Sequence, residues 1–503
     1  MTTDKKVYNK NKGVLAERDS YIPVQNELSP GTKNKNSIAV LPFHNTSSEK
    51  ELDYICDGIA EEIIDSLSKL KNLFVTARTS SFMFKNKEIS IQDISRKLNV
   101  NYVLNGSIRR RVEEYRISYQ LVDSATGYNI LSESFSSDFD NLYNSEKKIS
   151  QKIITHFNPD EGLSKDTDDF YINPVAYSYY LKGRYLINQW NKNDVFKAID
   201  NFNKALEIVP DYALAYAGLS TAHVHIVLNS FDDYRTHVEK AVEYAELSID
   251  ADSSIPDGYV ARAVATFLQG NLYLPDLEKN ITLALTISPC NAEIRMFNGM
   301  VFLFKGNLKR ALSELKLAKQ LDPFSNPINL RLGIVQYLNK DYQDAHNTFL
   351  SQLKEDAYKT NYLLRLTKCC IALKHYSKAL EYLSKASKDD AYYGIAYACY
   401  LIIYKNLKDE NKFFNYKSII ENQEKTDPSY AYNHAVLNYL KGNKELAIHF
   451  LEITLKDPMT ILMFFQYDTF WEDLHDHPFE MEAARRYRDR LSRGPYPCNS
   501  CRF

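Results

Sequence analysis

The sequence is poor in the residues that interrupt helices. Its 503 residues include only 16 glycines and 16 prolines, and this composition favours long helices over a loop-rich β protein. No sign of charge dominates either, because the formal net charge is −2. The chain as a whole therefore has little electrostatic attraction for nucleic acid or for an anionic membrane. We expect no nucleic-acid partner.

Cysteine and long apolar runs are also scarce. The seven cysteines show no spacing typical of a disulfide framework, which indicates a reducing compartment. The longest apolar stretches, such as residues 397–404 and 461–465, are far shorter than the ~20 residues that a membrane-spanning helix needs. Residues 1–36 lack the apolar segment of a secretory signal. We therefore expect a soluble, cytoplasmic chain without a membrane span.

What the sequence does contain is a pattern that returns about every 34 residues, eight times within residues 174–458. Gly299 and Gly333 are 34 positions apart, and so are Ala311 and Ala345. Small residues recur where two helices touch, and proline or aspartate recurs where the second helix ends. One such hairpin cannot bury its own apolar face, so the hairpins must stack. The pattern predicts a right-handed α-solenoid of about eight helical hairpins.

Residues 37–160 show the pattern of a small α/β domain. The apolar run at 38–43 predicts a buried strand, and residues 53–70 have helical spacing. Alternating apolar residues from 112 to 135 predict a β-meander. With a helix at 144–156, the predicted order β-α-β-α-β-β-β gives helices on a mixed sheet. Two further strands are predicted at residues 73–77 and 102–104, and one further helix is predicted at residues 91–98.

The remaining segments are predicted from their composition. We expect disordered tails at residues 1–36 and 493–503, and an acidic linker at 161–173. Residues 459–492 should contain a helix that caps the exposed end of the solenoid. The seventh hairpin, around residues 398–426, carries the weakest pattern.

Two regions resemble known families. The repeats resemble tetratricopeptide repeats, most clearly at Gly299–Pro323 and Ala198–Pro210. Residues 37–144 resemble the TolB-like domain that precedes such repeats in many bacterial proteins. The second resemblance depends on an ordered series of short motifs: Ile38–Phe43 with Asn45, Asp57–Ile59 with Glu61, Ala77–Phe82, and Gly106–Arg110.

The resemblance implies two classes of function. Such proteins often carry an upstream adenylate or guanylate cyclase domain or a winged-helix domain, for which residues 1–36 are too few. No glycine-rich phosphate loop follows the first strand either. We therefore expect a non-enzymatic scaffold without a cofactor, which binds a protein or peptide partner in bacterial signalling or envelope-related regulation. The alternative is a regulatory component or sensor whose α/β domain binds a small ligand.

The predicted binding surface is the concave face of the solenoid, lined by the first helix of each hairpin. Aromatic and arginine side chains there suit peptide capture. For the first hairpin, the alternative is that its tyrosines only pack against the α/β domain. Counting along the repeat places these residues on the concave face: Tyr177, Tyr180, Arg184, Arg262, Gln269, Met296, Met300, Tyr337, Asn361 and Lys368.

A second candidate site is an anion pocket formed by Arg78, Arg109 and Arg116 in the α/β region. The competing interpretation is structural, with these arginines paired to Asp57 or Asp123. Ion pairs of this kind are common on protein surfaces and individually weak. We favour the structural interpretation.

Other polar patterns are interpreted as structural. Glu61 and Asp65 are four positions apart on a predicted helix, where a pair of carboxylates is usually solvated. His223 and His225, two positions apart on a helix, point to different faces, so we interpret them as structural or solvated and not as a metal site. We assign no metal to the remaining pairs, His475-x-His477 and Cys498-x-x-Cys501.

Overall fold

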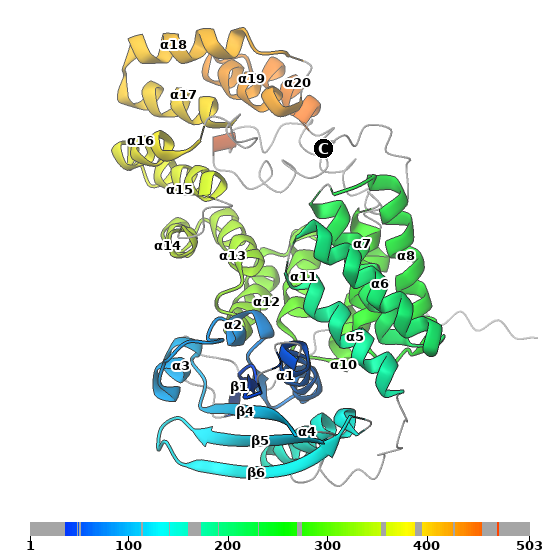
Figure 1. Ribbon diagram of the computed structural model, residues 1–503. Helices are drawn as coiled ribbons and strands as arrows, with labels where there is room; N and C mark the ends of the chain where they lie inside the picture. Colours follow the sequence, from blue (N-terminus) through cyan, green and yellow to red (C-terminus); the bar gives the residue numbers. More distant parts are fainter. Residues whose placement is uncertain are drawn as a thin grey trace, which may run out of the picture.

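The chain folds into an N-terminal α/β domain followed by helical hairpins (Figure 1). The computed structural model describes residues 36–471 apart from 48, 50–51, 112–113, 140, 159–172, 190, 230, 269–273, 354–358, 388–394, 426–427 and 455–469. The predicted tails, nearly all of the predicted linker and most of the predicted cap lie outside these residues. In the part of the chain that is described, no helix is long and apolar enough to cross a membrane.

The sheet of the α/β domain is mixed, as predicted. Its strand order is β3-β1-β4-β5-β6, with β2 paired to β4. β1 is parallel to β3 and β4, and β5 and β6 continue the sheet in antiparallel fashion. The short β2 was not predicted, and β4 is longer than predicted. The strands are β1 (Ser37–Val40), β2 (His44–Asn45), β3 (Phe74–Val75), β4 (Tyr102–Arg111), β5 (Glu114–Asp123) and β6 (Asn129–Asp138).

Four helices accompany this sheet: α1 (Asp53–Ser68), α2 (Arg78–Phe82), α3 (Ile91–Leu98) and α4 (Leu142–Phe157). The bounds of α3 match the prediction because the Ser90 side chain accepts a hydrogen bond from the Asp93 N–H and Asn99 adopts a left-handed conformation. The apolar face of α1, including Ile59 and Ile63, is buried in a core shared with the sheet and α4. The opposite face of α1 is left for contact with the hairpins.

The predicted solenoid is confirmed. The first helix and second helix of each hairpin pack closely; a Cβ atom on Gly333 would overlap the Phe349 ring of the next helix. The first four hairpins are α5 (Pro174–Ile187) with α6 (Lys192–Ile208), α7 (Ala213–Leu228) with α8 (Tyr234–Ala251), α9 (Pro256–Leu268) with α10 (Leu274–Ile287), and α11 (Ala292–Phe304) with α12 (Leu308–Leu321). The next four are α13 (Asn326–Leu338) with α14 (Tyr342–Gln352), α15 (Lys359–Ala372) with α16 (Tyr376–Lys385), α17 (Ala396–Leu407) with α18 (Glu410–Glu421), and α19 (Pro428–Leu440) with α20 (Lys444–Thr454).

The seventh hairpin is weakly patterned in sequence because aromatic stacking joins its helices in place of small residues. The Tyr400 ring of α17 stacks on the Tyr416 ring of α18, with centroids 4.3 Å apart and an interplanar angle of 10°. Tyr404 stacks on the same ring. At the end of the solenoid, Trp471 is fully buried against α19.

Candidate functional site: a cavity between the two domains

A cavity of about 630 Å³ lies between the α/β domain and the hairpins. One wall comes from α1, β3 and α2. The other comes from the first helices of five successive hairpins, α5, α7, α9, α11 and α13. The α/β domain therefore covers the concave face of these five hairpins. Representative residues of the solenoid wall, one from each helix, are Tyr180, Thr221, Asp257, Glu293 and Ile328.

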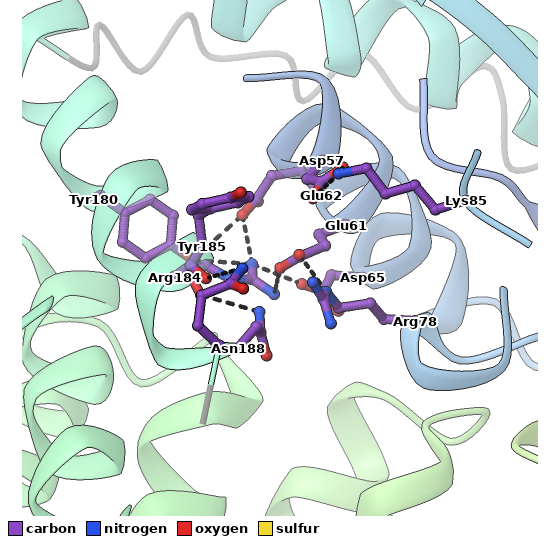
Figure 2. Close-up of polar contacts among 11 residues, drawn as sticks. Asp57, Glu61, Glu62, Asp65, Arg78, Lys85, Tyr180, Arg184, Tyr185 and Asn188 are labelled. Atoms are coloured by element: carbon purple, nitrogen blue, oxygen red, sulfur yellow. Dashed lines mark hydrogen bonds and ion pairs between the residues drawn. The ribbon is translucent and has the colours of Figure 1, made fainter. Parts of the chain in front are cut away.

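Arg184 of α5 connects the two domains at this cavity (Figure 2). Its guanidinium lies 3.0 Å from Glu61 Oε2, 2.7 Å from Glu62 Oε1 and 3.1 Å from Asp65 Oδ2. Arg78 of α2 forms a second ion pair with Glu61. The Glu61 side chain is only 2% exposed, so its interpretation as a solvated carboxylate was wrong.

Tyrosines of α5 hold the same face of the α/β domain. The Tyr177 hydroxyl donates a 2.6 Å hydrogen bond to Glu146 of α4, and the Tyr180 hydroxyl donates one of 3.2 Å to Glu62. The hydroxyls of Tyr54 and Ser178 are 3.0 Å apart. Tyr177 and Tyr180 thus lie where the alternative interpretation of the first hairpin places them, against the α/β domain.

A second anchor joins the α/β domain to the fourth hairpin. The Ala77 N–H donates to the Leu321 carbonyl at 2.8 Å, and the Ser80 hydroxyl donates to Asp322 Oδ1 at 2.5 Å. Ser80 lies within α2 and does not cap this helix. In an ordinary solenoid each hairpin contacts only its neighbours. Here the α/β domain also connects the first hairpin with the fourth.

Burial at this interface raises the pKa values of several carboxyl groups. It raises the pKa of Glu62 to about 7 and that of Asp65 to about 6, and the guanidinium of Arg184 offsets this only in part. The Asp65 side chain is 40% exposed and lines the cavity. Burial likewise raises the pKa of Glu293 to about 7 and that of Asp322 to about 6. Desolvation at this interface therefore favours the protonated, neutral form of these four carboxyl groups.

The other residues predicted to bind a partner differ in their burial and in their contacts. Arg262 is paired with Glu246 of the preceding helix at 2.7 Å. Lys368 is half-buried, with its ammonium 5.0 Å from the centre of the Tyr432 ring. Gln269 lies outside the described residues. The remaining four are buried, and their contact with a partner stays a prediction: Met296, Met300, Tyr337 and Asn361.

The structure does not bring the three arginines of the predicted anion pocket together. Arg78 lines the cavity, whereas Arg109 and Arg116 do not. These two lie opposite each other on β4 and β5, and both are exposed. The Nε atom of Arg116 donates to the Ser134 hydroxyl at 3.1 Å.

The predicted partners of these arginines are also engaged elsewhere. Asp57 lies within α1 and pairs with Lys85 at 2.7 Å. Asp123 accepts a 2.7 Å hydrogen bond from the Ala125 N–H in the β5–β6 turn. Among the described residues, Arg78 is thus the predicted arginine that pairs with a carboxylate, and its partner Glu61 is not one of those predicted.

The histidines of α7 take no part in a metal site in the described ranges, which contain no suitable group of three metal ligands. His223 Nδ1 lies 2.7 Å from His237 Nδ1 of α8, and burial lowers the pKa of His223 to about 4. The pairs at residues 475–477 and 498–501 lie outside the described residues.

Sequence reasoning missed the ion pairs between α1 and α5. The available signal was a row of polar residues on α1, opposite its apolar face: Tyr54, Gly58, Glu61, Glu62 and Asp65. This row follows the i, i+4, i+7 spacing of one helix face. A continuous acidic row beside a buried face indicates a second contact surface.

Parts of the chain are similar to a domain of transcriptional regulators and to a protein named as an adenylate cyclase. Residues 33–155 match the family described as HilA/YgeH-like transcriptional regulator, second domain. The chain is 33% identical over 243 residues to a protein named putative adenylate cyclase 3 from Rhizobium meliloti (strain 1021), covering 48% of this chain and 41% of that protein. It is 20% identical over 171 residues to transcriptional regulator HilA of Salmonella typhimurium, covering 33% of this chain and 30% of that protein.

Among solved structures, the chain is similar to that of Pseudomonas aeruginosa pilF. The TM-score is 0.35 and the identity 18%, over 43% of this chain and 96% of that chain. The TolB-like resemblance of the first domain stays a prediction. The chain spans less than half of the length of the curated relatives that it matches.

Proposed function

We propose that this chain is a non-enzymatic scaffold that binds an acidic protein segment on the concave face of its solenoid. The contact between α5 and α1 is the observation that supports the proposal. Arg184 and Tyr180 of α5, the first helix of its hairpin, both bind the Glu62 carboxylate of α1. Arginine and tyrosine are the residue types enriched at the energetic centres of protein interfaces. The inner face of this solenoid therefore has the chemistry of a helix-binding surface.

The part of the concave face that a partner can reach without moving the α/β domain begins at α15. Of the first helices, α15, α17 and α19 contribute no residue to the cavity. On α15, the half-buried Arg365 and Lys368 supply positive charge, and Lys368 reaches Tyr432 of α19. Such a surface favours an acidic partner segment through charge complementarity.

In this proposal the scaffold serves bacterial regulation, in signalling or in control of the envelope. Two similarities support that assignment. Residues 33–155 resemble a domain of HilA/YgeH-like regulators, and nearly half of the chain resembles a protein named as a putative adenylate cyclase. One is named for transcriptional regulation and the other for adenylate cyclase activity. A scaffold that connects such an output to a partner fits both names.

Partner capture from a lysate of the source organism tests the proposal. The full chain is compared with Arg365→Glu and Lys368→Glu, and with Lys378→Glu as the matched control on the second helix of the same hairpin. We expect a partner, quantified by mass spectrometry, to be lost at least fivefold in the two α15 variants and retained by the control. Equal capture by all four proteins would contradict binding at α15.

A second candidate function, small-ligand sensing, is supported by the cavity itself. Its volume of about 630 Å³ is within the usual range of ligand sites, and its walls mix apolar and charged side chains. A ligand that binds only the folded state must raise the melting temperature. We expect a compound from a metabolite collection to raise it for the wild-type chain and not for Thr221→Trp, which fills the cavity. If no compound distinguishes the two proteins, this candidate fails.

A further inference from the structure

Helix α1 occupies the concave face in the manner of a bound ligand. Five residues of one face meet the hairpins: Tyr54, Gly58, Glu61, Glu62 and Asp65. At Gly58 the Leu181 side chain packs so closely on the backbone of α1 that a Cβ atom would lie 2.7 Å from a Leu181 methyl carbon. This is the geometry of an amphipathic helix in a groove.

The other faces of α1 belong to the α/β domain. Ile55, Ile59 and Ile63 are buried in the core beneath the sheet. Helix α1 therefore has two functional faces. Its apolar face belongs to the core of the α/β domain, and its acidic face contacts the solenoid. A partner helix would need only the acidic face.

Away from the close contact at Gly58, the interface between the two domains is neither fully packed nor electrostatically balanced. It encloses the cavity, and five carboxylate residues line that cavity against two arginines, Arg78 and Arg184. The carboxylates come from both sides: Glu61 and Asp65 from α1, and Asp257, Glu293 and Asp322 from the solenoid. Polar interfaces of this kind between domains of one chain generally permit relative motion.

We propose that the α/β domain (β1–α4) is a displaceable cover over the first five hairpins, and that an acidic amphipathic helix of a partner can take the place of α1 on Arg184. The inference rests on the proposed function. It adds the chemistry of the partner, an acidic helix, and the step that exposes the first five hairpins, which is displacement of the α/β domain. The partner must carry carboxylates at the positions of Glu61, Glu62 and Asp65, because Arg184 contacts all three.

A peptide with the sequence of α1, residues 53–68 with Cys56→Ser, is the probe. Its fluorescence anisotropy is measured with full-length wild-type protein and with the double variant Glu62→Lys/Asp65→Lys, which places positive charge opposite Arg184 and opens the cover. We expect the peptide to bind the double variant at least tenfold more tightly than the wild type. A control peptide with lysine in place of Glu61, Glu62 and Asp65 should bind neither protein.

Opening of the cover is measured separately, by hydrogen exchange in α1. A milder variant, Ser80→Ala, removes the two hydrogen bonds of the Ser80 hydroxyl at the far anchor, to Asp322 and from the Phe324 N–H, and should raise peptide affinity about threefold if the double variant fails to fold. The proposal is overturned if exchange in α1 does not increase, or if it increases without a gain in peptide binding. Because the peptide tests the covered hairpins and the α15 variants test the uncovered ones, the two proposals can fail independently.

Discussion

Ser80 and Asp322 are 242 positions apart in the sequence, yet the serine hydroxyl donates a 2.5 Å hydrogen bond to the aspartate. The same hydroxyl accepts a 2.9 Å hydrogen bond from the Phe324 N–H. Ser80 is fully buried, so both bonds form away from water. Together with Arg184 at the opposite end, this contact fixes the α/β domain across four hairpins.

Replacement of Arg184 with alanine should destabilise the contact between the domains. It leaves Glu61, 2% exposed, with Arg78 as its remaining ion-pair partner. Removal of one partner of a largely buried ion pair typically costs about 3 kcal/mol. We expect a loss of this size in the free energy of unfolding, measured by urea denaturation. The matched change Arg262→Ala, at a more exposed ion pair, should cost less than about 1 kcal/mol; equal losses would contradict the special role of Arg184.

The contribution of Glu62 to stability should increase as the pH falls from 8 to 6. The pKa of Glu62 in the folded chain is about 7, above the roughly 4.3 of an unfolded chain. The folded state therefore binds this proton more tightly, and the resulting stability is lost as the pH rises through 7. Asp65 and Glu293 act in the same direction.

The variant Glu62→Gln isolates the contribution of this residue to the pH dependence. We expect the difference in free energy of unfolding between pH 6 and pH 8 to decrease by about 1 kcal/mol in this variant. Glu239→Gln, at an exposed position of α8, should leave the difference unchanged. A difference between pH 6 and pH 8 that is unchanged in Glu62→Gln would refute the prediction.

Gly333→Ala should destabilise the fifth hairpin, because the added Cβ atom overlaps the Phe349 ring. Overpacking of this kind costs about 1–3 kcal/mol. In the background Phe349→Leu, which removes the ring, the additional cost of Gly333→Ala should fall by more than half. A double-mutant cycle of thermal unfolding measures this coupling, and simple additivity would show that the ring is not the cause.

Cys290 should report on the opening of the cavity, because it lines the cavity wall beside α1. Burial raises the pKa of its thiol to about 11, so alkylation at pH 8 should be slow. In Arg184→Ala we expect Cys290 to react at least fivefold faster, as measured by mass spectrometry. Cys369 of α15, whose thiol pKa burial raises to about 12, is the internal control. Equal acceleration of both thiols would indicate general unfolding.

The local elements could be predicted from the sequence because their signals are local. The 34-residue spacing of Gly299 and Gly333 places the hairpins, and the Ser90 cap places the start of α3. The seventh hairpin gave a weak signal because Tyr400 and Tyr416 replace the usual small residues at the contact. Aromatic stacking has no fixed spacing that a repeat search can recognise.

The site could not be predicted in the same way. The partners of Arg184 are 119 and 122 positions away, and which helix faces meet there depends on the curvature of the stacked hairpins. The position count placed Tyr180 and Arg184 on the concave face, where the structure has them, but it gave no reason to expect the face to be occupied. The one available signal was the row of residues on α1 that includes Glu61, Glu62 and Asp65. From the sequence, only the pair Glu61 and Asp65 was considered, and a single pair of carboxylates is too common to indicate a contact surface.

The connection of the first hairpin to the fourth has a mechanical consequence. A solenoid whose hairpins contact only their neighbours can lengthen or shorten elastically, because small rotations between successive hairpins add along its length. The α/β domain is attached to the solenoid at Arg184 and at Asp322. These two attachments fix the distance between the first and the fourth hairpin. Elastic change of shape is then confined to the hairpins after α13, until one of the two attachments is released.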